Sequence, residues 1–162
     1  MSELGEADTR AKLIAPAIHA RGWTEDLIKR EESAGAVEIV AGKARRQSKR
    51  RTDYTLRVLV NPETQPVAIA LLEAKKESLA PGHGLDQAKG YARSSQYNVQ
   101  FVFSSNGHMF VEFDRSTGLT SLPRPLSEFP TPSEDQAQAR TTATCGASCR
   151  CLAASSRQLE PA

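Results

Sequence analysis

The chain has 162 residues, of which 39% are hydrophobic and 25% are charged, and its formal net charge at pH 7 is +2. These values are typical of one globular domain with its own core, and the charge alone is too small to indicate nucleic-acid binding. No run approaches the roughly 18 apolar residues that a membrane span requires, so we expect no membrane contact. The start of the chain is acidic and lacks an apolar export segment, which predicts a cytoplasmic protein.

Residues 3–20 are predicted to form an amphipathic helix, because their apolar side chains recur at intervals of three and four. The apolar positions are Leu4, Ala7, Ala11, Ile14 and Ile18. Pro16 removes one backbone hydrogen bond, so we expect a kink or a break there. We expect Gly22 to end the helix and Trp23 to be buried against a sheet.

Three strands are predicted in the first half of the chain, at residues 36–40, 54–60 and 67–72. A turn at residues 61–66 separates the last two. If the three strands pair in order, they form an antiparallel meander. Residues 67–72 are apolar at every position, so both faces of this strand should be covered.

A second helix is predicted at residues 85–97, followed by strands at 99–103 and 108–113. Asn106-Gly107 between these strands is typical of a two-residue hairpin turn, since both residues tolerate positive φ. A helix that crosses over between two strands favours parallel pairing. The expected fold is therefore a mixed α/β sheet.

The composition changes at Pro123. Four prolines fall within ten residues, and beyond Gln136 the chain consists mostly of Ala, Thr, Ser, Cys and Gln without an apolar period. Such a segment buries too little surface to offset its ordering entropy. We therefore expect a domain at residues 1–122 and a linker with a disordered tail at 123–162. The cysteines of this tail are interpreted as incidental.

An acid and a lysine, Glu73 and Lys75, end the apolar strand at residues 67–72. Side chains two apart on a strand project from the same face, and Asp53 is available upstream as a third charged group. Two carboxylates can hold Mg²⁺ while an ammonium orients the attacking water, which is the arrangement that metal-dependent phosphodiester cleavage needs. The alternative is an ordinary strand end at which the two charges reach solvent.

Two further pairs have helical i, i+4 spacing. Glu6 and Arg10 could form a solvated ion pair. Alternatively, if the helix covers the active edge of the sheet, Glu6 could add another acid to the metal site. Gln87 and Tyr91 could position a phosphate or support the metal site, or the tyrosine could simply pack.

Six cations lie within nine residues immediately before Asp53. They are Lys43, Arg45, Arg46, Lys49, Arg50 and Arg51. Such a run is typical of a solvated loop or of a loop that contacts phosphates, and its position beside a candidate metal-binding acid favours DNA contact.

Together these residues resemble the PD-(D/E)XK nuclease superfamily, and more narrowly the N-terminal nuclease domain of the restriction subunit of type I restriction-modification enzymes. The narrower resemblance covers about residues 3–115. Three stretches carry it, namely Thr9-Arg10 through Leu13-Ile14-x-Pro16 to Gly22-Trp23, Gln87-Ala88-x-x-Tyr91-Ala92, and Ser105-Asn106-Gly107.

The resemblance implies a restriction-endonuclease-like αβββαβ core, with a central mixed sheet flanked by helices. It implies that Asp53 and Glu73, with Glu6, hold Mg²⁺, that Lys75 is the catalytic lysine, and that Gln87 and Tyr91 form an accessory motif. The expected activity is hydrolysis of double-stranded DNA. The expected partners are the methyltransferase and specificity subunits of a type I restriction complex.

Thr52 replaces the proline of the motif, and the chain has neither a Walker A loop nor room for an ATP-driven translocase. We therefore expect a fragment of a longer subunit, while a truncated gene product and a free-standing nuclease stay open. Two other functions stay open, a catalytically inactive DNA-binding or assembly module and a purely structural domain.

Overall fold

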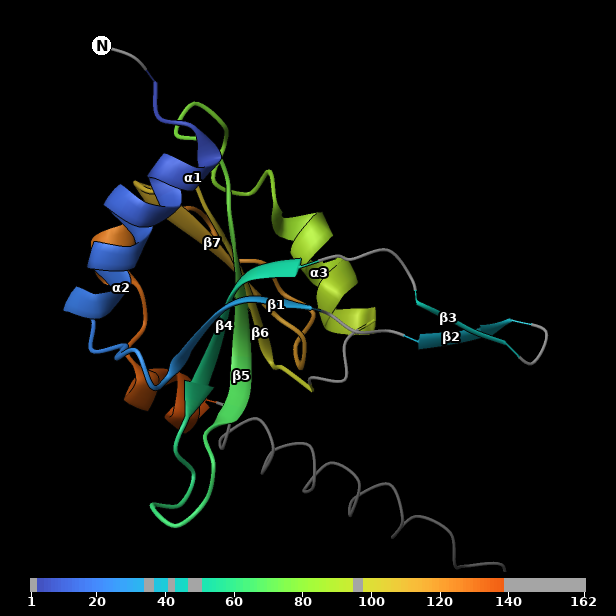
Figure 1. Ribbon diagram of the computed structural model, residues 1–162. Helices are drawn as coiled ribbons and strands as arrows, with labels where there is room; N and C mark the ends of the chain where they lie inside the picture. Colours follow the sequence, from blue (N-terminus) through green and yellow to red (C-terminus); the bar gives the residue numbers. More distant parts are fainter. Residues whose placement is uncertain (1–2, 34–36, 41–42, 47–50, 95–97, 139–162) are drawn as a thin grey trace, which may run out of the picture.

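A six-stranded mixed sheet forms the centre of the computed structural model, which describes residues 3–33, 37–40, 43–46, 51–94 and 98–138 (Figure 1). The strand order is β1-β4-β5-β6-β7-β8, and among the strands of the described ranges only β5 and β6 pair in parallel. The strands are β1 (Ile28–Ser33), β4 (Arg51–Val58), β5 (Val67–Ala74), β6 (Phe101–Ser105), β7 (Met109–Asp114) and β8 (Arg124–Pro125). The predicted mixed α/β sheet, with a parallel pair across a helical crossover, is confirmed.

The first strand of the sheet is β1, and the prediction that residues 36–40 fill this place was wrong. β1 pairs antiparallel with β4, whereas β2 (Val37–Val40) pairs only with β3 (Lys43–Arg46) in a separate hairpin. This hairpin projects away from the sheet in Figure 1. The sequence pattern missed β1 because it is a highly charged edge strand in which only Ile28 is a buried hydrophobic residue.

Strands β4 and β5 form the middle of the sheet and carry the candidate acids. Tyr54 lies opposite Leu72, and from Ile69 onward every residue of β5 is buried. Both faces of β5 are therefore covered from Ile69 onward, as predicted, whereas Val67 at its start is 53% exposed. Helices α1 (Glu6–Thr9) and α2 (Ala15–Ala20) lie on one side of the sheet and α3 (Leu85–Ser94) on the other (Figure 1).

The N-terminal helix is continuous but irregular. It comprises α1 (Glu6–Thr9), a π-helical turn at Arg10–Ile14 and α2 (Ala15–Ala20). The π turn stands in place of the expected kink and directly precedes Pro16, whose ring disfavours normal helical bonding one turn earlier. The extra residue per turn rotates the buried face. Ala7 and Ala11 are consequently exposed, contrary to the predicted stripe, whereas Thr9, Ile14 and Ile18 are buried.

The end of α2 follows the prediction. Gly22 adopts φ +90°, and Trp23 is fully buried in the core between the helix and the sheet. None of the helices in the described ranges is long and apolar enough to cross a membrane.

The connection between β6 and β7 has three residues, 106–108, and not two as expected. Gly107 has φ +92°, while Asn106 Oδ1 accepts hydrogen bonds from the backbone amides of His108 and Met109 at 3.2 and 3.0 Å. These hydrogen bonds to the Asn106 side chain stabilise a loop that is longer than the two-residue type I′ turn.

Residues 123–138, predicted to be part of a linker, instead pack against the sheet. They form β8, a 3₁₀ turn at Leu126–Glu128 and a helix at residues 132–138. Phe129 is fully buried, with its ring centroid 4.8 Å from that of Phe103, and the indole of Trp23 donates to the carbonyl of Pro130 at 2.8 Å. A few apolar anchors separated by prolines are enough to hold the segment, although it has no periodic pattern. Residues 139–162, including the cysteines, lie outside the described ranges.

Candidate active site

Glu73 and Lys75 lie side by side at the end of β5. The Lys75 Nζ donates to Glu73 Oε1 at 2.9 Å. Glu73 is only 3% exposed and Lys75 only 8%. Burial raises the pKa of Glu73 to about 7, because Lys75 only partly offsets the burial and the negative charges of Asp53 and Glu6 add to it. Burial lowers the pKa of Lys75, but the hydrogen bond and charge of Glu73, together with the charges of Glu6 and Asp53, raise that pKa above its ordinary value.

Asp53 joins three elements at the point where β4 and β5 separate. Its Oδ2 accepts from the backbone amide of Ala74 at 2.8 Å, and its Oδ1 accepts from Arg10 Nη1 at 2.8 Å. The carboxylate is therefore fixed by β5 and by the N-terminal helix. These contacts place Asp53 beside Glu73, as the pairing of β4 with β5 predicts.

The crossover helix α3 supports Lys75 from the other side. Gln87 Oε1 accepts from Lys75 Nζ at 3.1 Å, and Gln87 Nε2 donates to the hydroxyl of Tyr91 at 2.6 Å. Tyr91 is 5% exposed, so its ring also packs in the core on this face of the sheet. Tyr91 therefore packs, as one of the two alternatives predicted, and it also contacts Gln87; a role of the pair toward a phosphate or a metal stays a prediction.

Glu6 completes the cluster from α1, with Oε2 3.8 Å from Lys75 Nζ. The structure thus brings together all of the predicted catalytic and metal-binding residues. The Glu6–Arg10 ion pair that the spacing suggested is not formed among the contacts described. Asp8 and Lys12 make the i, i+4 pair of this helix.

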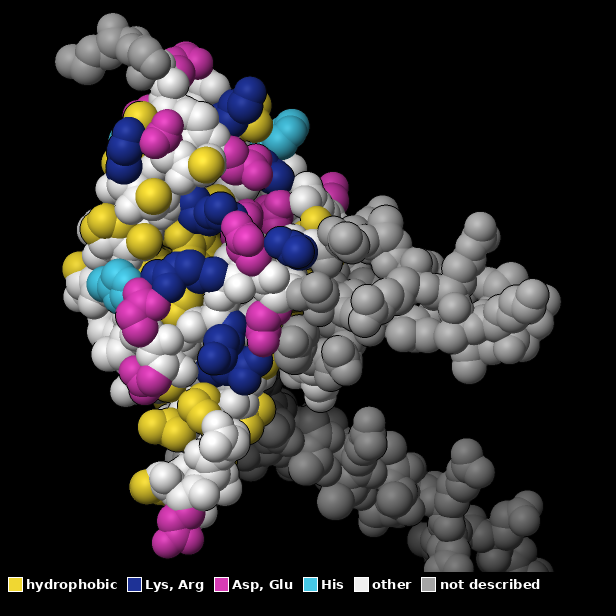
Figure 2. All heavy atoms as spheres, viewed as in Figure 1, with side chains coloured by type: hydrophobic (Ala, Val, Ile, Leu, Met, Phe, Trp, Pro, Cys, Tyr) yellow, Lys and Arg dark blue, Asp and Glu magenta, His cyan; other side chains and the backbone are white. Residues whose placement is uncertain are grey.

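Arg10 and Glu31 belong to the site, although the sequence did not point to their roles. Arg10 Nη2 donates to Glu31 Oε1 at 3.1 Å, and Arg51 Nη1 lies 3.5 Å from Glu31 Oε2. Acidic and basic side chains alternate over the middle of the face shown in Figure 2. Since β1 was not predicted, no local signal could place Glu31 beside Arg10.

Gly84 precedes α3 and lies against the charged pair. A Cβ atom at this position would lie 2.7 Å from Lys75 Cε and 2.9 Å from Glu73 Cγ. Its amide donates to Ser104 Oγ at 3.1 Å. Only glycine fits without displacing the pair. The signal in the sequence is the Gly-His-Gly segment just ahead of the predicted helix.

The acids fit a magnesium ion by their chemistry. In the described part of the chain, no group of three His, Cys, Asp or Glu side chains is arranged to hold a metal ion. Mg²⁺ usually binds one or two carboxylates and keeps several waters, so Asp53 and Glu73 suffice as donors. Burial is the main cause of the raised pKa of Glu73 and the negative charge of Asp53 adds to it; a divalent cation would relieve the repulsion between the two carboxylates.

The basic run is only partly within the described ranges. Lys43, Arg45 and Arg46 lie on β3, while Lys49 and Arg50 lie outside. Arg51 begins β4, where its exposed side chain approaches Glu31. The run therefore leads directly into the strand that carries Asp53.

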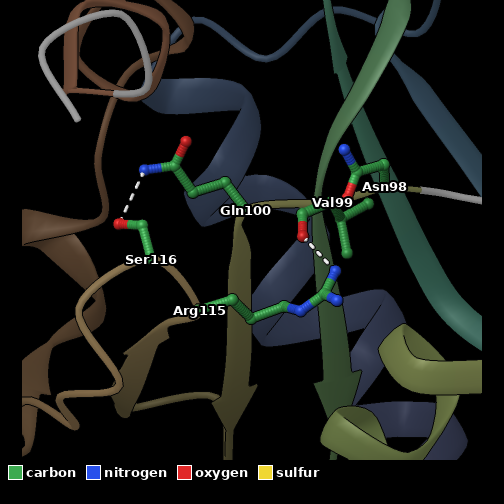
Figure 3. A pocket seen from close by; sticks show the side chains of 5 residues that line it. All are labelled: Asn98, Val99, Gln100, Arg115 and Ser116. Atoms are coloured by element: carbon green, nitrogen blue, oxygen red, sulfur yellow. Dashed lines mark hydrogen bonds between the residues drawn. The ribbon is translucent and has the colours of Figure 1, made fainter. Parts of the chain in front are cut away.

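A hollow of about 270 Å³ lies at the opposite end of β6 from the candidate site (Figure 3). Arg115 donates there to the carbonyl of Val99 at 2.6 Å, and Gln100 donates to Ser116 at 3.4 Å. Because Ser104, at the other end of β6, is the residue opposite Glu73, this hollow is separate from the acids.

Fold and site together define a mixed α/β domain with a buried acid–lysine cluster at the end of its central strands. No family model matches the sequence. The chain is 33% identical over 141 residues to the Type I restriction enzyme EcoAI endonuclease subunit of Escherichia coli, and the match covers 83% of this chain and 16% of that subunit.

A solved structure from Vibrio vulnificus YJ016, a fragment assigned to the HsdR subunit of a type I restriction enzyme, superposes with a TM-score of 0.68 at 32% identity. The match covers 88% of this chain and 26% of that chain. The protein is therefore homologous to a part of type I restriction enzyme HsdR subunits and spans well under a third of either relative. The predicted resemblance to the restriction subunit is confirmed at this level.

Proposed function

We propose that this chain is a Mg²⁺-dependent nuclease domain that hydrolyses phosphodiester bonds of double-stranded DNA, as part of a type I restriction enzyme. The convergence of Asp53, Glu73 and Lys75 at the end of β4 and β5 carries this proposal. Homology to an endonuclease subunit supports it. In this reading, β1, β4 and β5 with their flanking helices and β6 make up the αβββαβ core of the PD-(D/E)XK superfamily.

Each side chain has a role that follows from its contacts. Asp53 and Glu73 are the metal ligands, with Glu6 as a further acid, and bound Mg²⁺ would act as a Lewis acid on the phosphate. Lys75 presents a buried ammonium that stabilises negative charge developing on the substrate. Gln87 orients this ammonium and Tyr91 orients Gln87, so both are positioning residues.

DNA contact is proposed for the basic run at residues 43–51. Arg51 begins β4, the strand that carries Asp53, and β3 with Lys43, Arg45 and Arg46 precedes this strand in the chain. Cations at this place would neutralise backbone phosphates and would not read the base sequence. Methyltransferase and specificity subunits are the proposed partners, in the cytoplasm.

A cleavage assay on supercoiled plasmid tests the proposal. Asp53→Asn and Glu73→Gln should each reduce Mg²⁺-dependent cleavage by about 10²-fold or more, because each removes a charge at the reacting centre. Glu63→Gln, in the exposed turn between β4 and β5, is the matched control and should cleave like the wild type. Wild-type cleavage by either site variant would refute the assignment.

One observation favours an inactive DNA-binding or assembly module as the second candidate. Asp53 and Glu73 are each already paired with a cation, Arg10 and Lys75, as in a self-sufficient structural network. An inactive module would bind duplex DNA in a gel-shift assay while cleaving none in Mg²⁺, and the site variants would leave that binding unchanged.

A further inference from the structure

Arg10 is hydrogen-bonded to Asp53, one of the two acids that are proposed to bind the metal. Its Nη1 donates to Asp53 Oδ1 at 2.8 Å, and the other oxygen of Asp53 accepts from the amide of Ala74 at 2.8 Å. A divalent cation on Oδ1 would therefore lie next to a guanidinium. Two positive charges at such short range repel each other strongly in a partly buried site.

Glu31 offers the same guanidinium a second acceptor. It accepts from Arg10 Nη2 at 3.1 Å, and it lies on β1 beside the Asp53 region of β4. Arg30 pairs with Tyr54 and Glu32 with Thr52, but the register skips Glu31, which has φ +53°. A non-glycine residue in this conformation is strained by about 1–3 kcal/mol, and such strain is typical of functional sites.

The surroundings leave Arg10 room to move. A hollow of about 410 Å³, lined by Ala7, Ala11, Ala15 and Tyr54 among others, borders both Arg10 and Glu31. The backbone of Arg10 is held where the π turn begins, since the Tyr54 hydroxyl donates to its carbonyl at 3.0 Å. The side chain can thus change partner while the helix stays in place.

Lys75 is the more deeply buried of the two cations. It has Glu73 and Gln87 as hydrogen-bond acceptors and Glu6 at 3.8 Å, and its side chain is only 11% exposed. The Arg10 side chain is 28% exposed and shares its two arms between two acids. When a divalent cation enters, Arg10 is the group that can yield.

We propose that Arg10 is a built-in counter-ion of Asp53 that competes with the divalent cation, and that Glu31 retains Arg10 when Asp53 is released. The exchange of Arg10 between Asp53 and Glu31 then sets the metal affinity of the site. This proposal rests on the proposed function, because it assumes that Asp53 binds a metal. Arg10 is thus a positioning residue and makes no contact with the reacting atoms.

Calorimetric titration of the 162-residue chain with Ca²⁺, without DNA, measures the exchange directly. Arg10→Gln should tighten Ca²⁺ binding by about tenfold, which corresponds to about 1.4 kcal/mol. Lys12→Gln removes the same charge from the same helix at an exposed ion pair and should change Kd by less than about twofold. Arg10→Lys keeps the charge but has no fork, so its affinity should fall between those of the wild type and Arg10→Gln.

A double-mutant cycle separates an effect through Arg10 from simple loss of a negative charge. Glu31→Gln should weaken Ca²⁺ binding by about threefold or more in the wild type, but clearly less in the Arg10→Gln background. If Glu31 acted only through its negative charge, Glu31→Gln would weaken Ca²⁺ binding at least as much in the Arg10→Gln background as in the wild type. An equal or larger effect in that background would overturn the role of Glu31.

The outcomes distinguish this inference from the proposed function. If wild-type binding is abolished by Asp53→Asn but Arg10→Gln and Arg10→Lys bind no more tightly than the wild type, the metal site stands and the competition is refuted. If neither the wild type nor Arg10→Gln binds Ca²⁺, the metal site and the competition fail together.

Discussion

At the scale of single residues, the site is a set of charged side chains that are shielded from water and compensate one another by ion pairs and hydrogen bonds. Lys75 shows this most directly, because it contacts Glu73 and Gln87 and lies near Glu6 while almost fully buried. A buried cation loses much hydration and persists only with such partners. Its role in chemistry and its role in folding can therefore be tested separately.

Replacing Lys75 with Met keeps the length of the side chain and removes its charge. We expect single-turnover cleavage in Mg²⁺ to fall by about 10²-fold or more, since a contact to developing charge is lost. Calorimetry should still detect Ca²⁺ binding, because both acids remain. An unchanged single-turnover rate would show that Lys75 is a structural partner of Glu73.

Asp135 is a buried ionisable side chain outside the candidate site. It is fully buried, and neither of its carboxylate oxygens has a hydrogen-bond partner in the described part of the chain. Burial raises its pKa from 3.8 to about 8, with the charges of Glu112 and Glu134 adding to the effect. The folded state therefore binds more protons than the unfolded state between these values, and stability falls as pH rises through this window.

Asp135→Asn cannot ionise, so its advantage over the wild type should grow with pH. We expect almost no difference in the free energy of unfolding near pH 4 and a gain of about 1–3 kcal/mol at pH 8, limited by local detachment of the helix at residues 132–138. Urea titrations at several pH values measure this. Asp26→Asn, at an exposed position, is the control. A gain that is independent of pH would contradict the explanation.

At the scale of elements, the approach of α3 to the end of β5 determines the shape of the site. Gly84 permits this approach, because a side chain there would meet Lys75, Glu73 and Ser104 within 3 Å. The β2–β3 hairpin makes a different contribution, since it carries cations outside the sheet.

Gly84→Ala should displace the flexible end of Lys75 before it disturbs the backbone. We expect a loss of about 1–3 kcal/mol in the free energy of unfolding. The misplaced lysine should reduce cleavage by about 10²-fold. Gly90→Ala, inside α3, meets no atom within 4 Å, so the variant should gain up to about 1 kcal/mol in the free energy of unfolding while cleavage is retained. Full cleavage by Gly84→Ala would show that the close contact does not position Lys75.

Replacing Arg45, Arg46, Arg50 and Arg51 together by Gln tests the basic run. If these residues neutralise phosphates, affinity for unrelated duplexes should fall alike, and the log–log salt slope should flatten by at most about 4 units. The measurement is a fluorescence-anisotropy titration at several salt concentrations. Lys12→Gln with Arg93→Gln, both exposed, provides the comparison. A wild-type slope in the quadruple variant would mean that DNA approaches from elsewhere.

At the scale of the whole molecule, the described end of the chain completes the core. Leu126 and Phe129 fill the space between α2 and the sheet, and Phe129 lies 4.8 and 5.1 Å from Phe103 and Phe110 between ring centroids. The domain therefore extends past the boundary at residue 122 that composition suggested.

Phe129→Ala should reduce the free energy of unfolding by about 3–5 kcal/mol, because the surrounding rings cannot fill the cavity completely. Urea denaturation checks this value. Leu122→Ala, at a position that is 84% exposed, should stay within about 0.5 kcal/mol of the wild type. A similarly small effect of Phe129→Ala would return residues 123–138 to the status of a linker.

Local patterns in the sequence predicted the elements whose information is local. The apolar run at residues 67–72, the crossover helix and the following strand were sufficient for β5, α3, β6 and the parallel pairing. The spacing of Glu73 and Lys75 placed both on one face, and the register of β4 brought Asp53 to them. Alternation and helical period are properties of neighbouring residues, so one sequence reveals them.

The tertiary structure alone decided the contacts between distant segments. The charged edge strand β1, the partners of Arg10 and the docking of residues 123–138 each depend on residues far apart in sequence. A charged side chain in an edge strand or after a helix has the same local pattern whether or not an opposite charge faces it. Only the folded chain determines which charges meet, because packing of the core and not local periodicity brings them together.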